Sequence, residues 1–202
     1  MRTSHNYGSQ YDNADTKIVR NTEYAMDPMT NSTFDAQKLM HHLPMMPYQE
    51  VADIGAGAGR IAIPMAKFLH DGKVVAIDID KDKIAALKEA IKETNLTNVE
   101  AKSVGEGKRL PLKNDSVDGV VLSMVLHHVD DPKFILSEAR RILKTAGWLA
   151  VLELHKREDV EGHPLEERLD ETDAKAMLLE HEFRSRGRHD IDGRYYLLVE
   201  RK

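Results

Sequence analysis

The residues in this chain best suited to chemistry lie in one glycine-rich run, residues 51–62. The run opens with apolar residues and an acid, Asp53, and three glycines follow at alternate positions, Gly55, Gly57 and Gly59. Glycine adopts backbone conformations that other residues avoid, and it lets a ligand lie directly against the backbone. An apolar helical pattern follows, so a helix N-terminus would point its N–H groups at that ligand. The run therefore indicates a loop that holds a nucleotide-type cofactor.

The charge of Asp53 helps to choose between two such cofactors. Counted from Gly55, the dinucleotide fingerprint needs a glycine where Arg60 stands, but counted from Gly57 it is satisfied with Ala62 in the last place. The glycines alone therefore leave NAD open. A carboxylate at the mouth of the loop would repel a pyrophosphate at close range. It suits a ligand that carries an ammonium group and a sulfonium, which describes S-adenosylmethionine.

A second acid, Asp78, lies 19 positions after Gly59, at the end of another apolar run. A carboxylate at that place can accept hydrogen bonds from ribose hydroxyls, whichever of the two cofactors is bound. The next residue, Ile79, would then lie against the adenine face.

Two adjacent histidines, His127 and His128, follow a later apolar run. A histidine with a near-neutral pKa can take a proton from a hydroxyl, amine or thiol, so both are candidate catalytic residues. Glu153 and His155 follow the next strand and could line the same face. Adjacent histidines, even with the aspartates at positions 130 and 131, chelate an ion poorly, so we expect no metal.

The elements that must position these residues alternate along the chain. We expect strands over 51–54, 73–79, from 99, over 118–124 and 149–152, and helices over 32–43, 61–69, 81–94, 132–143 and 172–181. Ser32 and Asp35 stand at capping-box spacing before the first helix. Strands that are apolar on both faces and alternate with helices predict an α/β fold with a parallel sheet covered on both sides.

The chain ends in a different pattern. Two strands, expected over 183–191 and 194–200, are joined across Asp192-Gly193, a dipeptide typical of tight hairpins. The parallel sheet should therefore finish in an antiparallel hairpin.

The composition excludes several classes of function. The chain has 202 residues, a formal net charge of −5 and no cysteine. The charge gives no general attraction to nucleic acid, and the lack of cysteine removes disulfides, thiolate metal sites and a cysteine nucleophile. No stretch reaches the roughly 18 apolar residues of a membrane span, so we expect a cytoplasmic protein. We expect residues 1–31 to form a lid or a flexible segment and residues 32–202 to form one domain.

Several motifs, in order, resemble those of the class I S-adenosylmethionine-dependent methyltransferases. Residues 53–59 resemble motif I of that family, and residues 103–112 resemble its acidic loop and leucine-proline step, with Glu106 in place of the usual aspartate. Residues 115–129 resemble the fourth-strand region, and residues 143–149 the turn into the fifth strand. The resemblance runs from about residue 36 to 153, and the hairpin extends it to residue 201. It is strongest to the small-molecule type, the ubiquinone/menaquinone biosynthesis methyltransferases.

The resemblance implies a Rossmann-like seven-stranded methyltransferase sheet, mostly parallel with an antiparallel C-terminal hairpin and with helices on both faces. It implies that Glu106 accepts from the adenine amino group and that the Gly107 N–H donates to a ring nitrogen. Ser123 would offer backbone contacts to the methionine part. The full set of cofactor-binding residues is then Asp53, Gly55, Ala56, Gly57, Gly59, Asp78, Ile79, Glu106, Gly107 and Ser123.

The implied reaction is an in-line transfer of a methyl group to a small-molecule acceptor, with S-adenosylhomocysteine as the product. Residues 123–126 lack the Pro-Pro-aromatic motif of amino-methylating DNA enzymes, so we expect no direct nucleic-acid substrate. A homodimer is left open. Two alternatives also stay open: an NAD-dependent oxidoreductase, and a protein that binds S-adenosylmethionine without catalysis.

Overall fold

The computed structural model describes residues 34–105 and 107–202, and the expectations for residues 1–31, Ser32 and Glu106 lie outside them. Its strands are β1 (Glu50–Ile54), β2 (Lys73–Asp78), β3 (Val99–Ser103), β4 (Val117–Ser123), β5 (Leu143–Leu154), β6 (Arg184–Ile191) and β7 (Tyr195–Arg201). Its helices are α1 (Ala36–Met40), α2 (Ala62–Phe68), α3 (Lys81–Glu93), α4 (Pro132–Ile142), α5 (Glu171–Glu180) and a short 3-10 helix, η1 (Leu165–Glu167).

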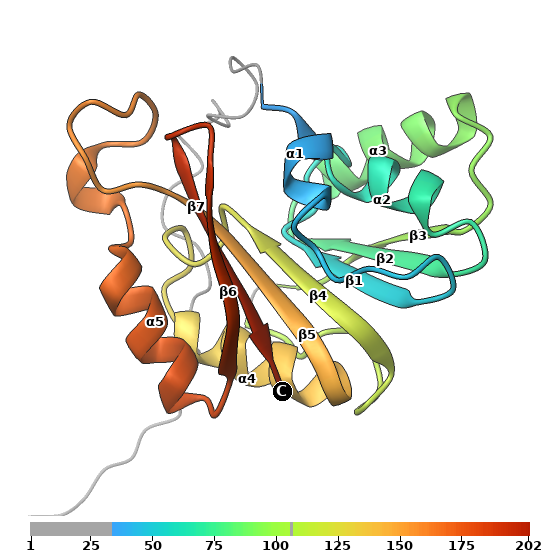
Figure 1. Ribbon diagram of the computed structural model, residues 1–202. Coiled ribbons are helices and arrows are strands. Elements are labelled where there is room, and N and C mark those ends of the chain that lie inside the picture. The colour runs from blue at the N-terminus through green and yellow to red at the C-terminus, as the bar shows by residue number, and fades with distance from the viewer. Residues whose placement is uncertain (1–33, 106) are drawn as a thin grey trace, which may run out of the picture.

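The seven strands form one sheet in the order β3-β2-β1-β4-β5-β7-β6 (Figure 1). The strands β1 to β5 pair in parallel, while β7 runs antiparallel to both β5 and β6. The order reverses at β1, which lies between β2 and β4. Ligands of such sheets bind beyond the carboxyl ends of the strands at this reversal. The predicted mostly parallel sheet with a terminal hairpin is confirmed.

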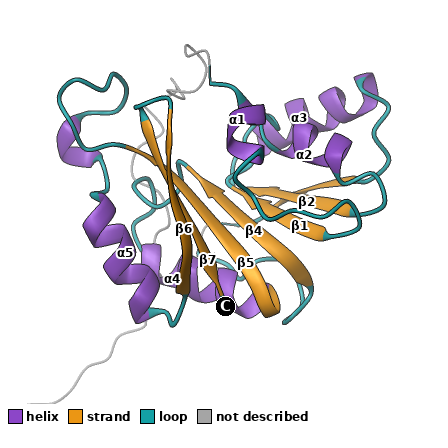
Figure 2. Ribbon diagram, in the orientation of Figure 1, coloured by secondary structure: helices purple, strands orange, loops and turns teal. Residues whose placement is uncertain are grey.

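The helices divide between the two faces of the sheet (Figure 2). One apolar layer contains residues of α1, α2 and α3, among them Leu39, Met65 and Leu87. The other contains residues of α4 and α5, among them Leu136 and Leu178. Successive residues of a strand point to opposite faces, so each central strand contributes to both layers. None of the helices in the described ranges has the length and hydrophobicity that a membrane crossing needs.

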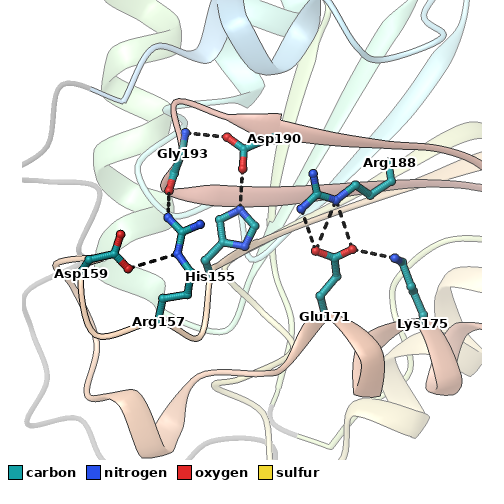
Figure 3. A network of polar contacts seen from close by, with 8 residues as sticks. All are labelled: His155, Arg157, Asp159, Glu171, Lys175, Arg188, Asp190 and Gly193. Atoms are coloured by element: carbon teal, nitrogen blue, oxygen red, sulfur yellow. Dashed lines mark hydrogen bonds and ion pairs between the residues drawn. The ribbon is translucent and has the colours of Figure 1, made fainter.

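The hairpin turn has the geometry that its residues predict. Asp192 and Gly193 both have positive φ, 57° and 64°, as a type I′ turn requires. Gly193 N–H donates to Asp190 Oδ1 at 2.6 Å, which closes the turn. In the middle of β6, Arg188 ties the strand to α5, because its guanidinium bonds Glu171 (Figure 3).

Two elements, α1 and β5, differ from their predicted ranges by more than one residue. The first helix begins at Ala36, and its N-cap is Asp35, whose carboxylate accepts from Gln37 N–H at 2.9 Å. Asp35 therefore caps the helix itself instead of completing a capping box. The fifth strand starts at Leu143, directly after α4, although Ala146 has a φ of 64°. The turn expected at Ala146-Gly147 is a bulge inside β5. Leu143 pairs with Val117 on one side of the bulge, and Trp148 pairs with Gly119 on the other.

Candidate functional site

The glycine-rich loop leaves β1 at the carboxyl edge of the sheet. Gly55, Gly57 and Gly59 have φ values of 74°, 53° and 92°, in the region that favours glycine. The N–H groups of Gly55 and Ala56 both donate to the carbonyl of Ile77, at 2.8 and 3.1 Å. These bonds fix the loop against the end of β2 and turn the chain toward α2.

The three glycines meet different surroundings. A Cβ on Gly55 would lie 2.5 Å from Val125 Cγ2, and one on Gly59 would lie 2.3 Å from Leu87 Cδ1. These two glycines allow close packing. A Cβ on Gly57 would have nothing within 4 Å in the described part of the chain, so this position faces open space. Gly57 is therefore the glycine against which a ligand can lie.

Asp53 is almost completely buried, with 1% of its surface exposed. Its Oδ2 atom has no hydrogen-bond partner among the described residues. Burial, with a smaller effect from the charge of Asp78, raises the pKa of the Asp53 carboxyl to about 7. A buried carboxylate oxygen without a partner is costly unless a cation or a donor meets it. The loop therefore carries a group suited to a positively charged ligand.

Asp78 holds the loop from the second strand. Its Oδ2 accepts from Gly57 N–H at 2.7 Å, and its Oδ1 accepts from Asp80 N–H at 2.9 Å. Each carboxylate oxygen can accept a further bond, so the group is oriented for a pair of hydroxyls. Ile79 follows it and is half-buried. The structure thus brings the loop, Asp78 and Ile79 to one place, as predicted from their spacing.

Two further predicted positions lie on neighbouring segments. Ser123 is buried at the end of β4, where it pairs with Leu152. Gly107 has a φ of 65° and lies exposed in the turn that follows β3. Both segments follow strands that flank β1 and β2, so their ends share the carboxyl edge of the sheet.

The histidine pair follows β4 directly. The Nδ1 atom of His127 contacts Glu153 Oε2, and both side chains are almost fully buried. The other oxygen of Glu153 accepts from Leu126 N–H at 2.8 Å. Nδ1 of His128 donates to the carbonyl of Met124 at 2.9 Å. Met124 has a φ of 58°, which is rare for a residue with a Cβ and common near functional sites.

A third histidine, His163, joins the pair from a loop far along the chain. Its ring centroid lies 4.7 Å from that of His127 and 4.5 Å from that of His128. Sequence reasoning missed His163, because it is a lone histidine in a charged stretch without a motif. His155, expected on the substrate face, instead bonds Asp190 Oδ2 at 2.8 Å (Figure 3).

The loop that carries His163 is held by a buried arginine. Arg168 donates to the carbonyls of His155, Arg157, Val160 and His163, at distances between 2.6 and 3.0 Å. On its outer side, Arg157 bonds the carbonyl of Gly193 at the tip of the hairpin (Figure 3). His163 is therefore placed by a network of hydrogen bonds within residues 155–168.

With this geometry in place, comparison with known proteins identifies the family. Residues 52–151 match a family described as a methyltransferase domain. The matched range begins in β1, contains the glycine loop, Asp78 and the histidine pair, and ends in β5. The chain belongs to the class I S-adenosylmethionine-dependent methyltransferases.

Relatives and solved structures agree with this class I methyltransferase assignment. An O-methyltransferase of Pyrenophora dematioidea is 28% identical over 120 residues, which cover 58% of this chain and 43% of that protein. A demethylmenaquinone methyltransferase of Listeria welshimeri is 32% identical over 104 residues, 51% of this chain and 44% of that protein. The chain thus spans less than half the length of these relatives.

One solved structure has the same fold over most of the chain. A methyltransferase of Aquifex aeolicus, described as SAM-dependent, superposes with a TM-score of 0.80 at 24% identity, covering 87% of this chain and 98% of that one. The site residues of the chain described here also fit S-adenosylmethionine, the cofactor of the family. Within the part of the chain that the structure describes, the Asp53 oxygen without a partner suits the positive charge of that cofactor, and the open space at Gly57 leaves room for it.

Proposed function

We propose that this protein transfers a methyl group from S-adenosylmethionine to a small-molecule acceptor. The observation that carries the proposal is a buried Asp53 oxygen without a partner, next to a loop whose Gly57 faces open space, as far as residues 34–105 and 107–202 define both. A pyrophosphate would bring negative charge toward that carboxylate, whereas an ammonium or sulfonium would satisfy it. S-adenosylmethionine, when bound, supplies a methyl group that is already activated by the positive charge on sulfur.

In this proposal, the residues of the chain bind the cofactor and orient it toward the acceptor. Asp53 meets the positive end of the ligand, the Gly57 backbone lies against it, and Asp78 accepts from the ribose hydroxyls. Ile79 packs on the adenine, with Glu106 and Gly107 at its edge and Ser123 near the methionine part. Orientation of two reactants and exclusion of water can account for most of the rate of such a displacement.

The remaining chemical step is removal of a proton from the attacking hydroxyl, amine or thiol of the acceptor. His127 and His128 are the candidate residues for it, as predicted. His128 is exposed, and its Nδ1 donates to a carbonyl, so its Nε2 is the nitrogen free to accept. The side chain of His127 is buried against Glu153 and suits a positioning role.

The names of the relatives support a small acceptor. The fungal relative is named for O-methylation and the Listeria relative for demethylmenaquinone, and we propose a small molecule of that general kind. A cytoplasmic location, a homodimer and the lack of a direct nucleic-acid substrate stay predictions.

Ligand-dependent thermal unfolding tests the cofactor. S-adenosylhomocysteine at 100 times its dissociation constant should stabilise the protein by about 2.7 kcal/mol. NAD at the same concentration should not change the unfolding temperature. Stabilisation by NAD alone would favour the oxidoreductase alternative. Turnover of a labelled methyl donor in metabolite extracts then separates an enzyme from a protein that only binds the cofactor.

A further inference from the structure

Three histidines from two distant segments of the chain meet beyond the end of β4. His127 and His128 are adjacent, with ring centroids 3.9 Å apart, and His163 comes from the loop after β5. One candidate ligand nitrogen from each ring lies within 4.8 Å of the other two. Because bonds from a zinc ion to imidazole nitrogen are about 2.0–2.1 Å long, small ring movements would bring all three onto one ion.

The hydrogen bonds of the rings show which nitrogens are available. The Nδ1 atoms of His127 and His128 face a carboxylate and a carbonyl, which accept, so both Nδ1 atoms carry the proton. In the neutral rings, Nε2 is then the bare nitrogen. The Nε2 atoms of His127 and His163 are buried and have no hydrogen-bond partner within the described ranges. Buried nitrogens without partners are rare unless a ligand meets them.

The surroundings of the rings hold them in place. A carboxylate that bonds the second nitrogen of a histidine is the usual outer partner of a metal ligand, and Glu153 does this for His127. Glu153 is itself held by Leu126 N–H, and the loop of His163 is held by Arg168. The three rings are therefore set by the fold before any ion arrives.

We propose that His127, His128 and His163 form a binding site for a divalent transition-metal ion of the Zn²⁺ type. Imidazole nitrogen suits Zn²⁺ and its neighbours, whereas Mg²⁺ and Ca²⁺ prefer oxygen ligands. The group that the described residues form has three ligands, and His128 exposes it to solvent. A fourth coordination position is thus open to water or to an oxygen of a bound molecule.

The sequence predicted no metal, because adjacent histidines, even with the aspartates that follow them, chelate an ion poorly. His163 adds a third imidazole from another segment, so this prediction no longer has its basis. The metal inference does not depend on methyl transfer. With an ion bound, the three Nε2 atoms are ligands, and no histidine of the group serves as a base.

Metal titration of the full-length chain tests the site. The protein is treated with a chelator, the chelator is removed, and Zn²⁺ alone is titrated by calorimetry. We expect one equivalent to bind, and His163→Gln to weaken its affinity by about 100-fold or more. Glu153→Gln should weaken it by about 10- to 100-fold, the usual effect of losing an outer partner. Co²⁺ in place of the spectroscopically silent Zn²⁺ should give the visible absorption bands of a tetrahedral site.

A second histidine pair supplies the matched control. His42 and His189 stack with ring centroids 4.2 Å apart on the protein surface. His42→Gln should leave the Zn²⁺ titration unchanged. Equal binding by the parent and His163→Gln, loss in His42→Gln, or no bound equivalent would each overturn the site.

Folding of the variants is checked separately by far-ultraviolet circular dichroism and by binding of S-adenosylhomocysteine. If His163→Gln is misfolded, His128→Gln replaces it, because His128 is exposed. A variant that keeps the nucleoside and loses Zn²⁺ supports the metal site. Loss of S-adenosylhomocysteine binding by the parent would instead count against the proposed function and leave the metal titration as a separate result.

Discussion

At the scale of single residues, Asp53 and the glycines decide what the loop can hold. Asp53 is a buried carboxyl group with one oxygen that has no partner among the described residues, and its pKa is raised to about 7. In the free protein, this residue contributes stability that is complete below its ordinary pKa of 3.8 and is lost as the pH rises to about 7. In the free protein, burial favours the protonated carboxyl of Asp53. A cationic ligand would instead favour the ionised carboxylate, because opposite charges attract.

Binding of S-adenosylhomocysteine should therefore strengthen as Asp53 ionises. With a pKa of about 7, the carboxyl is mostly protonated at pH 6 and mostly ionised at pH 8. We expect the affinity to rise by roughly tenfold across that range, since the ionised fraction of a group with this pKa rises about tenfold from pH 6 to pH 8. Calorimetry at several pH values measures it. Asp53→Asn should remove the pH dependence of the affinity. Asp71→Asn, which changes an exposed acid, should leave that dependence as in the parent. An affinity of the parent that does not change with pH would contradict the role proposed for Asp53.

Gly57→Val should abolish cofactor binding and leave the fold largely intact. The branched side chain would occupy the open space at Gly57 and would resist the φ of 53°. The positive φ alone costs about 1–2 kcal/mol of stability. Fluorescence titration with S-adenosylhomocysteine and a urea melt measure both effects.

Gly193→Val is the matched control for that variant. Gly193 also has a positive φ, 64°, and no described atom within 4 Å of its Cβ position. It lies in the hairpin turn, so it should share the loss of stability and keep the cofactor. Equal binding by Gly57→Val and the parent would show that the ligand lies elsewhere.

The sequence predicted the local backbone geometry of the loop, because a tight turn and a strand end each have a residue signature. Gly55 and Gly57 have the positive φ expected of glycine, and Asp78 ends β2, while their part in cofactor binding stays a prediction. The position of His163 could not be predicted, because only the folding of the loop after β5 brings it to the histidine pair. Nor could the sequence separate the packing glycines from Gly57, since neighbours distant in sequence define that difference.

At the scale of elements, the segment between β5 and α5 depends on Arg168. It has only the short helix η1, and the buried guanidinium accounts for much of its internal bonding. The predicted boundaries of the regular elements, α1 and β5 excepted, lie within one residue of the observed ones, because apolar periodicity marks them. The conformation of this segment was not, because it follows from one arginine and four carbonyls with no periodic pattern.

Arg168→Met should loosen this segment and leave the sheet folded. Loss of the guanidinium leaves the carbonyls of Val160 and His163 without a donor among the described residues, at a cost of about 1–3 kcal/mol of stability. Limited proteolysis should cut within residues 156–168 faster than in the parent, with a matching fall in the urea midpoint. Arg157→Met, in the same segment but exposed, should change both by much less. Unchanged cleavage in Arg168→Met would show that the network does not hold the loop.

At the scale of the whole molecule, one continuous sheet joins the cofactor half to the hairpin half. Trp148 lies at this junction: it is 3% exposed, and its ring covers Gly119 of β4. Its Nε1 donates to Gln49 Oε1 at 3.3 Å, just ahead of β1. As the chain has one tryptophan, its fluorescence reports this junction alone.

Unfolding followed by Trp148 fluorescence and by far-ultraviolet circular dichroism should therefore coincide. A ligand that binds only the folded state shifts a cooperative transition as a unit. S-adenosylhomocysteine should move both curves by the same amount, although the hairpin is remote from the glycine loop in sequence. Two separate midpoints, or a shift seen by one probe alone, would show that the halves unfold independently.

The hydrogen bonds of Asp78 have a consequence for how a nucleoside is captured. Both carboxylate oxygens are already anchored by backbone donors, so the group has little rotational freedom left to surrender. Immobilising a free side chain costs about 0.5–1.5 kcal/mol on association, and here that ordering is completed during folding. These bonds shape the loop, and in the proposed function the same carboxylate would also accept from the sugar hydroxyls. An alanine at this position would remove both backbone anchors at once, whereas asparagine keeps one acceptor oxygen and therefore one of the two anchors.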